Sequence, residues 1–209
     1  MSELAPAPEP RPYHHGDLKA ALLAKAETIL EREGLHGLTL RAAARAAGVS
    51  HAAPANHFGD LTGLLSELAA VGFNRFTAAL AAAQLEAGDS PGGRAAAMGA
   101  AYVRFARTCP GMFLLMFRVE RLDATRPALC DALDAARKAL RAATRGVAPE
   151  TPVDPLQTAA QAAALWSLVH GFAMLLLDGR LDGMLAALPE GDTAETLLDA
   201  VLAMTRIGD

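Results

Sequence analysis

The chain of 209 residues is 52% hydrophobic, 20% charged and 5% aromatic. That apolar share supplies a sizeable core and excludes a disordered chain, and because most of it is Ala and Leu, with few β-branched residues, we expect an all-α fold. The formal net charge of -4 excludes a protein that coats nucleic acid non-specifically, since such proteins are strongly basic.

The N-terminal segment is expected to be an arm followed by a helix. Residues 1–12 are rich in proline and lack the basic start and apolar run of a signal peptide, so we expect a disordered arm. A first helix should begin at Asp17, a good N-cap, and end at Gly34. Its apolar residues recur at helical spacing and are Leu18, Ala21, Leu22, Ile29 and Leu30.

Residues 38–61 carry the pattern of a helix-turn-helix. Thr39 is a candidate N-cap for a second helix, which Gly48 would end. The motif needs a small residue where its helices touch, a glycine in the tight turn and an apolar residue after it. Ala44, Gly48 and Val49 supply these three, so the sequence predicts a DNA-binding unit.

A third, short helix is expected from Ser50, its candidate N-cap, to Phe58, with its first residues directed at a major groove. The stretch from Gly34 to Gly59 contains no Asp or Glu. Its basic and histidine residues are Arg41, Arg45, His36, His51 and His57. A locally cationic surface on an acidic protein fits site-specific DNA binding, although so short a stretch could also lack acids by chance.

The rest of the chain alternates helical patterns with loops. Asp60 or Thr62 would cap a long fourth helix that ends near Glu86, and loops rich in glycine or proline are expected at 88–93 and 146–155. Further helices are expected at 94–108, 110–118, 126–145, 156–178 and 193–206, with a capping-box spacing between Asp192 and Glu195. We therefore expect about nine helices in total.

One apolar segment and two cysteines bear on the compartment. Residues 159–177 contain no charged side chain, but they include Gln, Ser, His and Gly and lack an aromatic belt or a positive flank. We expect a helix buried on all sides, as at a dimer interface, and no membrane contact. Cys109 and Cys130 match no metal or redox spacing and make no disulfide framework, so a cytoplasmic location is expected.

Two separated motifs carry a family resemblance. The helix-turn-helix is followed by the pair His57 and Phe58 and by an acidic turn at Gly59 and Asp60, and residues 13–75 resemble the DNA-binding part of the TetR/AcrR family of bacterial repressors. The segments His14–Gly16 and Ser50–Pro54 are similar to one branch of that family, named for Trp, His and Gly in its ligand-binding domain. Trp166, His170 and Gly171 match that second motif on a different helix.

The resemblance implies a three-helix DNA-binding domain over residues 13–60 and a helical ligand-binding and dimerisation domain over 61–209. The residues that it places against DNA are Thr39, Arg41, Ser50, His51, Asn56 and His57. Arg41 would take a phosphate or a guanine edge, and Asn56 could pair with adenine. Three alternatives stay open. His57 contacts phosphate or packs inside the fold, and Arg45 faces DNA or is a solvated surface charge. His14 and His15 belong either to a DNA-binding arm or to a polar linker.

Three positions depart from the family pattern. Many relatives have a Tyr where this chain has Ala55 and a Lys where it has Leu61, and both usually hold phosphates, which supply much of the affinity for DNA. Their loss predicts weaker or more salt-sensitive binding. Pro54 would be the fourth helical residue if Ser50 is the N-cap, so the third helix is also consistent with a later start.

An apolar ligand pocket is expected between the later helices. Its candidate lining residues are Tyr102, Phe105, Phe113, Met116, Phe117, Trp166, His170 and Met174. Trp166 and His170 are four residues apart and so share a helix face. His170 could bond a ligand or be a satisfied core group, and the Phe and Met side chains could equally be ordinary core. The helices at 156–178 and 193–206 would form a four-helix bundle in a dimer, or belong to the core of a single chain.

The predicted function is that of a sequence-specific transcriptional regulator. We expect a cytoplasmic homodimer that binds a double-stranded operator, an inverted repeat, and that a small, largely apolar effector releases. No hydrolase elbow, P-loop, zinc-protease or dinucleotide motif is present, so we expect no enzyme, no catalytic residue, no cofactor and no metal. The alternative is a helical ligand-binding or adaptor protein with weakened or lost DNA binding.

Overall fold

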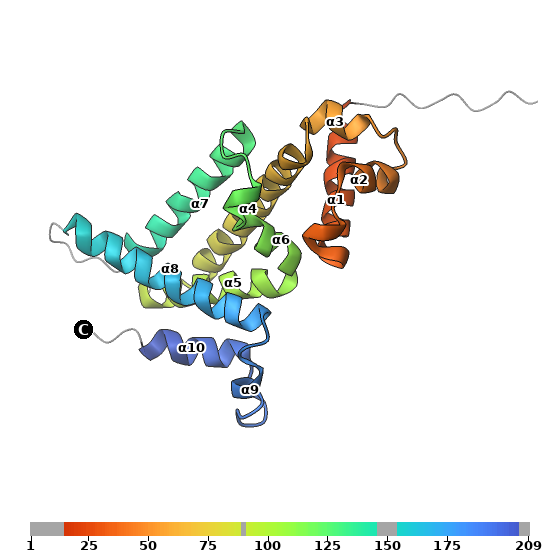
Figure 1. Ribbon diagram of the computed structural model, residues 1–209. Helices are drawn as coiled ribbons and strands as arrows, with labels where there is room; N and C mark the ends of the chain where they lie inside the picture. The colour runs from red at the N-terminus through yellow and green to blue at the C-terminus, as the bar shows by residue number, and fades with distance from the viewer. Residues whose placement is uncertain (1–14, 89–90, 146–153, 205–209) are drawn as a thin grey trace, which may run out of the picture.

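The computed structural model describes residues 15–88, 91–145 and 154–204, and within these ranges the chain is helical and has no strand (Figure 1). The helices are α1 (His15–Gly37), α2 (Leu40–Ala47), α3 (Ala53–Phe58), α4 (Leu61–Glu86), α5 (Pro91–Thr108), α6 (Pro110–Met116), the 3-10 helix η1 (Val119–Arg121), α7 (Pro127–Arg145), α8 (Pro155–Leu177), α9 (Asp182–Leu185) and α10 (Ala194–Met204). The all-α prediction is confirmed, with α9 and η1 as additions. The predicted arm at residues 1–12 lies outside the described residues.

The first three helices form a small unit, which we call the reading head. Thr39 caps α2, because its hydroxyl oxygen accepts a hydrogen bond from the backbone N–H of Ala42 at 3.0 Å. Gly48 ends α2 with a φ of 68°, a conformation that favours glycine, and so allows the tight turn. The buried face of α2, which includes Ala43 and Ala44, packs on α1. The predicted helix-turn-helix geometry is therefore present.

Two boundaries in the reading head differ from the prediction. Helix α1 begins at His15, so the predicted start and N-cap at Asp17 are wrong; Gly34 does interrupt the helix as predicted, with a φ of 68°, and a short helical stretch follows to Gly37. The third helix begins at Ala53 and has Ala52, without a side-chain cap, at its N-terminus, so the predicted capping role of Ser50 is wrong. The later start places the buried Pro54 in the first turn, where a missing N–H leaves no hydrogen bond unmade.

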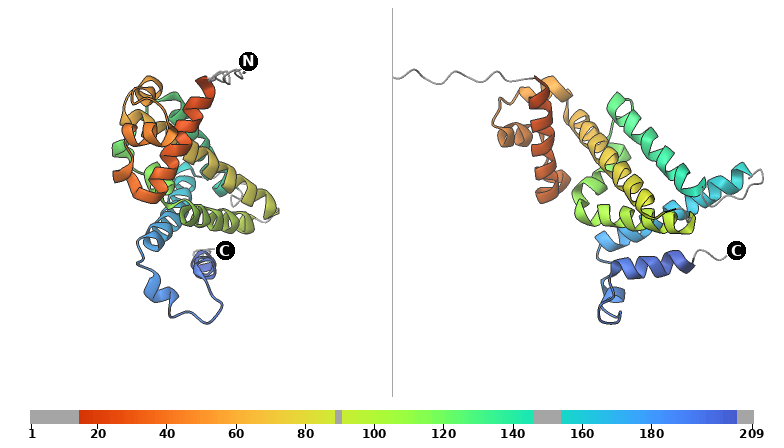
Figure 2. Two further views of the ribbon diagram at one scale, coloured as in Figure 1. Left: turned by 90° about the vertical axis from the view of Figure 1, so that its right-hand side faces the viewer. Right: turned by 180° about the vertical axis from the view of Figure 1, so that it is seen from behind.

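Helix α4 leads from the reading head into the rest of the chain. We call helices α4 to α10 the body. Asp60 is its N-cap, since Oδ1 accepts from the N–H of Gly63 at 2.8 Å, which decides between the two predicted capping residues. The helix is apolar on most of its circumference and packs along both α5 and α7. The views from the side and from behind show it running from the head through the body (Figure 2).

The end of the body is built on α5. Both α8 and α10 pack on α5, and α9 lies in the connection between them. The first turn of α10 has a reciprocal cap, but one residue later than predicted. Thr193 Oγ1 accepts from the backbone N–H groups of Glu195 and Thr196, and Thr196 Oγ1 accepts from the N–H of Thr193. The predicted pairing of Asp192 with Glu195 is therefore wrong.

Helix α8 is the described helix that is long and apolar enough to cross a membrane by length and composition alone. In the single chain its buried residues are Val169, Phe172 and Ala173, whereas most of its first half is exposed. The expectation that it is buried on all sides is thus wrong for one chain, because few elements cover its N-terminal turns (Figure 1).

Candidate DNA-binding surface and ligand site

The reading head presents a polar surface near the ends of α2 and α3. Thr39 and Arg41, at the start of α2, are exposed, and so are Ser50 and His51, in the turn before α3. Asn56 is exposed on α3 itself. The backbone therefore brings these five predicted residues to the surface of one three-helix unit, where side chains can reach a groove.

His57 differs from the other predicted DNA-binding residues because it is half-buried. Its ring centroid lies 6.2 Å from that of Phe58, which is fully buried in the core. The imidazole therefore lies beside a core ring, and the residue remains partly accessible to solvent.

Two of the three departures from the family pattern, Ala55 and Leu61, have different surroundings. Ala55 is exposed on α3, so a larger side chain there would meet solvent or DNA. Leu61 is half-buried and packs against the hydrophobic core at the start of α4. Leu61 thus contributes to packing, which a lysine at this position would not do in the same way.

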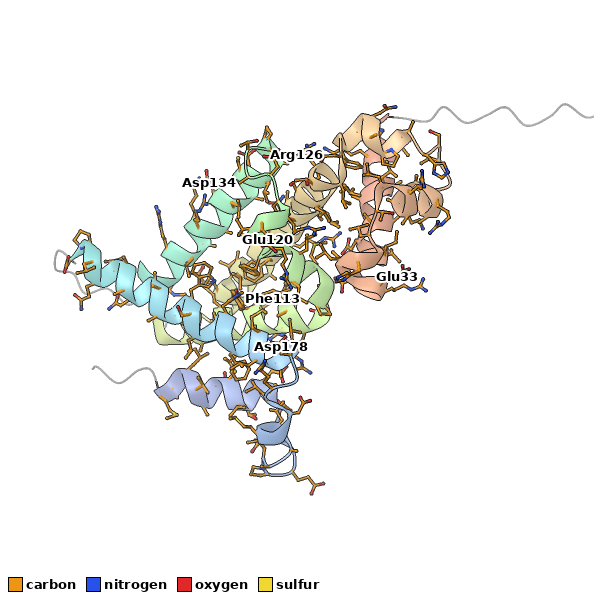
Figure 3. The ribbon with its side chains drawn as sticks, in the orientation of Figure 1. Glu33, Phe113, Glu120, Arg126, Asp134 and Asp178 are labelled. Carbon is orange, nitrogen blue, oxygen red and sulfur yellow. The ribbon has the colours of Figure 1, made fainter. Side chains whose placement is uncertain are left out.

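An aromatic cluster surrounds His170 in the body. The ring centroid of Phe117 lies 4.6 Å from that of His170, that of Phe113 lies at 5.8 Å, and those of Tyr102 and Trp166 lie at 6.3 Å. The hydroxyl of Tyr102 shares a hydrogen bond of 2.8 Å with Nδ1 of His170. Phe113 lies where α5, α6 and α8 meet (Figure 3).

Burial keeps this cluster uncharged. Desolvation lowers the pKa of His170 below its ordinary value, which favours the neutral imidazole. Desolvation raises the pKa of Tyr102 far above its ordinary value, and the side-chain hydrogen bond with Trp166 opposes this in part. A neutral Tyr102 can donate its hydroxyl proton to an unprotonated Nδ1, so the pair satisfies itself without a charge.

A small cavity of about 50 Å³ lies beside this cluster. Its lining residues come from α4, α5, α7 and α8 and are Leu80, Ala95, Met98, Gly99, Tyr102, Leu140, Leu165, Trp166 and Val169. Tyr102 and Trp166 are the two predicted pocket residues among them. Trp166 is 44% exposed, so this wall of the cavity borders the surface.

The other predicted pocket residues pack around the cluster or within the core. Phe105, Phe113 and Met116 are buried, and Phe117 and Met174 are half-buried against the same core. The missed cavity residues are mostly small or aliphatic and lie on four helices far apart in the sequence. No local sequence signal distinguishes them from other core residues. Among the described residues, no group of three His, Cys, Asp or Glu is placed to hold a metal.

The reading head and the body are joined by contacts of α1. The carboxylate of Glu31 accepts hydrogen bonds from the backbone N–H groups of Gly111 at 2.9 Å and Met112 at 2.8 Å, at the start of α6. A β-carbon at position 111 would lie 2.8 Å from the carbonyl oxygen of Leu30, so the two helices approach closely there. Glu27 of α1 also pairs with Arg75 of α4. Since α6 carries Phe113, it touches both α1 and the His170 cluster.

The fold and the site define a class of protein: a helix-turn-helix head attached to an all-helical body that contains an apolar cavity. The model of the family described as "Tetracyclin repressor-like, C-terminal domain" matches residues 95–201, more than half of the 209 residues. The chain belongs to the TetR family of transcriptional regulators. Members of this family bind operator DNA, dimerise and respond to small molecules.

Solved structures share the fold. The chain is similar to a protein of unknown function from Rhodococcus sp. RHA1, with 35% identity over 93% of this chain and 96% of that one, and a TM-score of 0.75. It shares its fold with the TetR family transcriptional regulator PfmR from Thermus thermophilus, at 21% identity, 88% and 95% coverage and a TM-score of 0.59. It also shares its fold with the multidrug binding protein EbrR complexed with imidazole, at 20% identity, 96% coverage of both chains and a TM-score of 0.58.

No curated protein matches the chain. The matched family description does not name the Trp-His-Gly branch, so that finer assignment stays a prediction.

Proposed function

We propose that this protein is a cytoplasmic repressor that binds an inverted-repeat operator as a homodimer and is released by a small, uncharged, largely apolar ligand. The observation that carries the proposal is the position of α6, which contacts α1 of the reading head through Glu31 and the His170 cluster through Phe113. We propose a binding function with no catalysis, in which residues 13–60 read DNA and residues 61–209 sense the ligand and dimerise.

The DNA-reading roles follow from exposure and chemistry. Arg41 is exposed at the start of α2 and can reach a phosphate or the acceptor edge of a guanine. Asn56 on α3 has the donor and acceptor pattern that adenine requires in the major groove. The hydroxyl proton of Thr39 remains available for a phosphate, because the capping bond uses only its oxygen as an acceptor. We assign Ser50, His51 and the accessible part of His57 to backbone contacts.

The dimer is proposed to form through α8 and α10. The side of α8 that the core leaves uncovered carries small residues at helical spacing, the exposed Ala160, Ala164 and Ser167 and the half-buried Gly171. Small residues allow two helices to approach closely, and burying this apolar face would stabilise an assembly. Met204 on α10 is also apolar and exposed, so α10 contributes to the uncovered apolar surface. A second copy would thus cover the long apolar helix.

The ligand is proposed to enter beside Trp166 and to enlarge the existing cavity. A volume of about 50 Å³ is far below the roughly 300–1,000 Å³ of ordinary ligand pockets, so ligand binding must move side chains. Its walls are mostly aliphatic, and His170 and Tyr102 are held neutral, so a charged ligand would lack a partner. Because the Tyr102 hydroxyl proton is directed to Nδ1 of His170, its oxygen can accept one hydrogen bond from a donor group on the ligand.

We propose that α6 transmits ligand binding to DNA. A ligand that displaces the aromatic cluster would move Phe113 and therefore α6, and the two hydrogen bonds from α6 to Glu31 would carry this movement to α1. The ligand changes the relative populations of two states, one with the head placed to bind DNA and one with the head moved away from that position. It does so only through its different affinities for these two states.

Selection of genomic fragments by the purified protein, followed by gel shifts at two salt concentrations, tests the proposal. We expect enrichment of one inverted repeat and an affinity that falls steeply with salt. The absence of any enriched sequence at low salt, with folded protein, would contradict the DNA-binding part. It would favour instead a ligand-binding or adaptor protein in which Ala55 has removed an essential phosphate contact.

A further inference from the structure

A short segment of the body reaches the junction between the recognition helix α3 and α4. The backbone N–H of Asp123 donates to the hydroxyl oxygen of Ser66 at 2.8 Å, and Ser66 in turn donates to the carbonyl oxygen of Thr62 at 2.7 Å. The carboxylate of Asp123 accepts from the N–H and the hydroxyl of Thr125, which fixes the turn before α7. The segment that leads into α7 is therefore attached to the first turns of α4.

Arg126, at the end of this segment, is part of an ionic group of three residues from three helical regions. Its Nε lies 3.6 Å from Oε1 of Glu67 on α4, and Oε2 of Glu67 lies 2.8 Å from Nζ of Lys19 on α1. The Glu67 side chain is only 14% exposed, so solvent screens the group less than a fully exposed pair. One carboxylate thus holds a cation of the reading head and a cation of the body.

The Arg126 guanidinium also fills the space over Gly63. A β-carbon at that position would overlap the carbonyl oxygen of Phe58, the last residue of α3, and would lie 2.6 Å from Nη1 of Arg126. Figure 3 places Arg126 between the start of α7 and the first turns of α4. The side chain therefore lies at the point where the head would have to turn relative to the body.

We propose that Arg126 is a positioning residue that, through Glu67 and Lys19, sets the angle of the reading head and thereby the spacing between operator half-sites that the dimer accepts. The proposal rests on the proposed function for its DNA part. The contact of Arg126 with Glu67 involves neither α6 nor the cavity. The body would therefore hold the head through Glu67 and move it through Glu31. None of the three residues needs to touch DNA.

Spacer variants of the selected operator test the positioning role. The central spacer is lengthened or shortened by one or two base pairs, and affinities are measured for the wild type, Arg126→Ala, Arg126→Lys and Arg121→Ala. If the head is fixed, the wild type should bind one spacer length about tenfold or more tightly than the others, a loss of affinity similar to that caused by one wrong base pair. Arg126→Ala should reduce this preference to less than about threefold. Arg126→Lys should restore most of it.

The matched control is Arg121→Ala, which removes the same charge from the exposed η1 helix nearby and should keep the wild-type preference. Lys19→Met removes the third member of the group without opening a cavity. It should reduce the preference for one spacer length, as Arg126→Ala does. An unchanged preference in Arg126→Ala, whatever its overall affinity, would overturn the proposal.

Hydrogen exchange of the free protein gives a readout that requires no DNA. We expect faster exchange in α1 and in the first turns of α4 for Arg126→Ala and for Lys19→Met, and wild-type exchange for Arg121→Ala. If the wild type selects no operator, the proposed function fails, while exchange still decides whether Arg126 holds the head. Identical exchange in all variants would overturn the positioning role.

Discussion

The reading head and the body differ in where their functional groups lie. In the head, the groups proposed to contact DNA are exposed polar side chains next to caps and turns, such as Thr39 and Ser50. In the body, the groups proposed to sense a ligand are mostly buried aromatic rings, such as Phe113, packed around one neutral histidine. An exposed head residue that caps no helix, such as Arg41, can therefore be changed with little effect on stability, whereas most changes in the sensing cluster act on both stability and function.

The largest expected effect is at the centre of the body. Phe113 is fully buried, so Phe113→Ala should lower the free energy of unfolding by about 3–5 kcal/mol, measured by urea denaturation. Leu85→Ala is the control, since Leu85 is 84% exposed and its loss should cost less than about 0.5 kcal/mol. A cost for Phe113→Ala close to that of the control would mean that the ring borders an open ligand space and is not core.

The next effect is expected on DNA binding in the head. Arg41→Ala should weaken operator binding by about 1–3 kcal/mol if Arg41 contacts a base, with the thermal midpoint almost unchanged. Fluorescence anisotropy with the operator and with a scrambled duplex separates the roles, since an equal loss on both indicates a phosphate contact. Arg45→Ala, on the same helix, shows whether removing any exposed cation has this effect.

A gain of binding is expected from the exposed position Ala55. Ala55→Tyr should tighten operator binding by about 1 kcal/mol, because the phenol would add a hydrogen bond to a phosphate. Ala46→Tyr, at another exposed alanine of the head, serves as the control in the same gel shifts. If Ala55→Tyr binds no better than this control, the alanine does not mark a lost phosphate contact.

The smallest effect is expected from the titration of His170. Because burial lowers the pKa of His170 in the folded state, the unfolded chain takes up the proton first as the pH falls. Stability should therefore decrease as the pH drops through the ordinary value of 6.5, and the loss should level off below the lowered folded pKa.

His170→Asn removes this titration and keeps a polar atom near Tyr102. Thermal midpoints at about pH 7.5 and about pH 5.5 should differ more for the wild type than for this variant. Equal differences would show that the imidazole is hydrated in the folded protein and does not couple the cluster to pH.

The same contrast between head and body explains how much could be predicted from the sequence. Caps and turns depend on a few neighbouring residues, so Thr39 and Gly48 could be assigned in advance, and Asp60 was one of two candidate caps. Ser50 could not, because the chain turns once more before α3 and Pro54 occupies its first turn. The cap of α10 was displaced by one residue because the hydroxyl of Thr196 reciprocates with Thr193.

The candidate ligand site was less predictable because a cavity depends on packing between distant segments. Aromatic content identified Tyr102 and Trp166, but residues such as Gly99 and Leu140 line the cavity only because α5 and α7 come together there. The contacts of the head with the body, at Glu31 and Glu67, depend equally on long-range packing. Charged residues on an amphipathic helix give no local sign of the partner that they meet.

The most direct test of the account is native mass spectrometry of the protein with its selected operator and with the same duplex carrying one scrambled half-site. We predict a symmetric dimer in which each reading head binds one half-site. The intact operator should therefore bind two chains, or a multiple of two, and the scrambled duplex should bind much more weakly. A single chain bound with equal strength to both duplexes would contradict the central claim that two heads, held at a fixed spacing by the body, read the operator together.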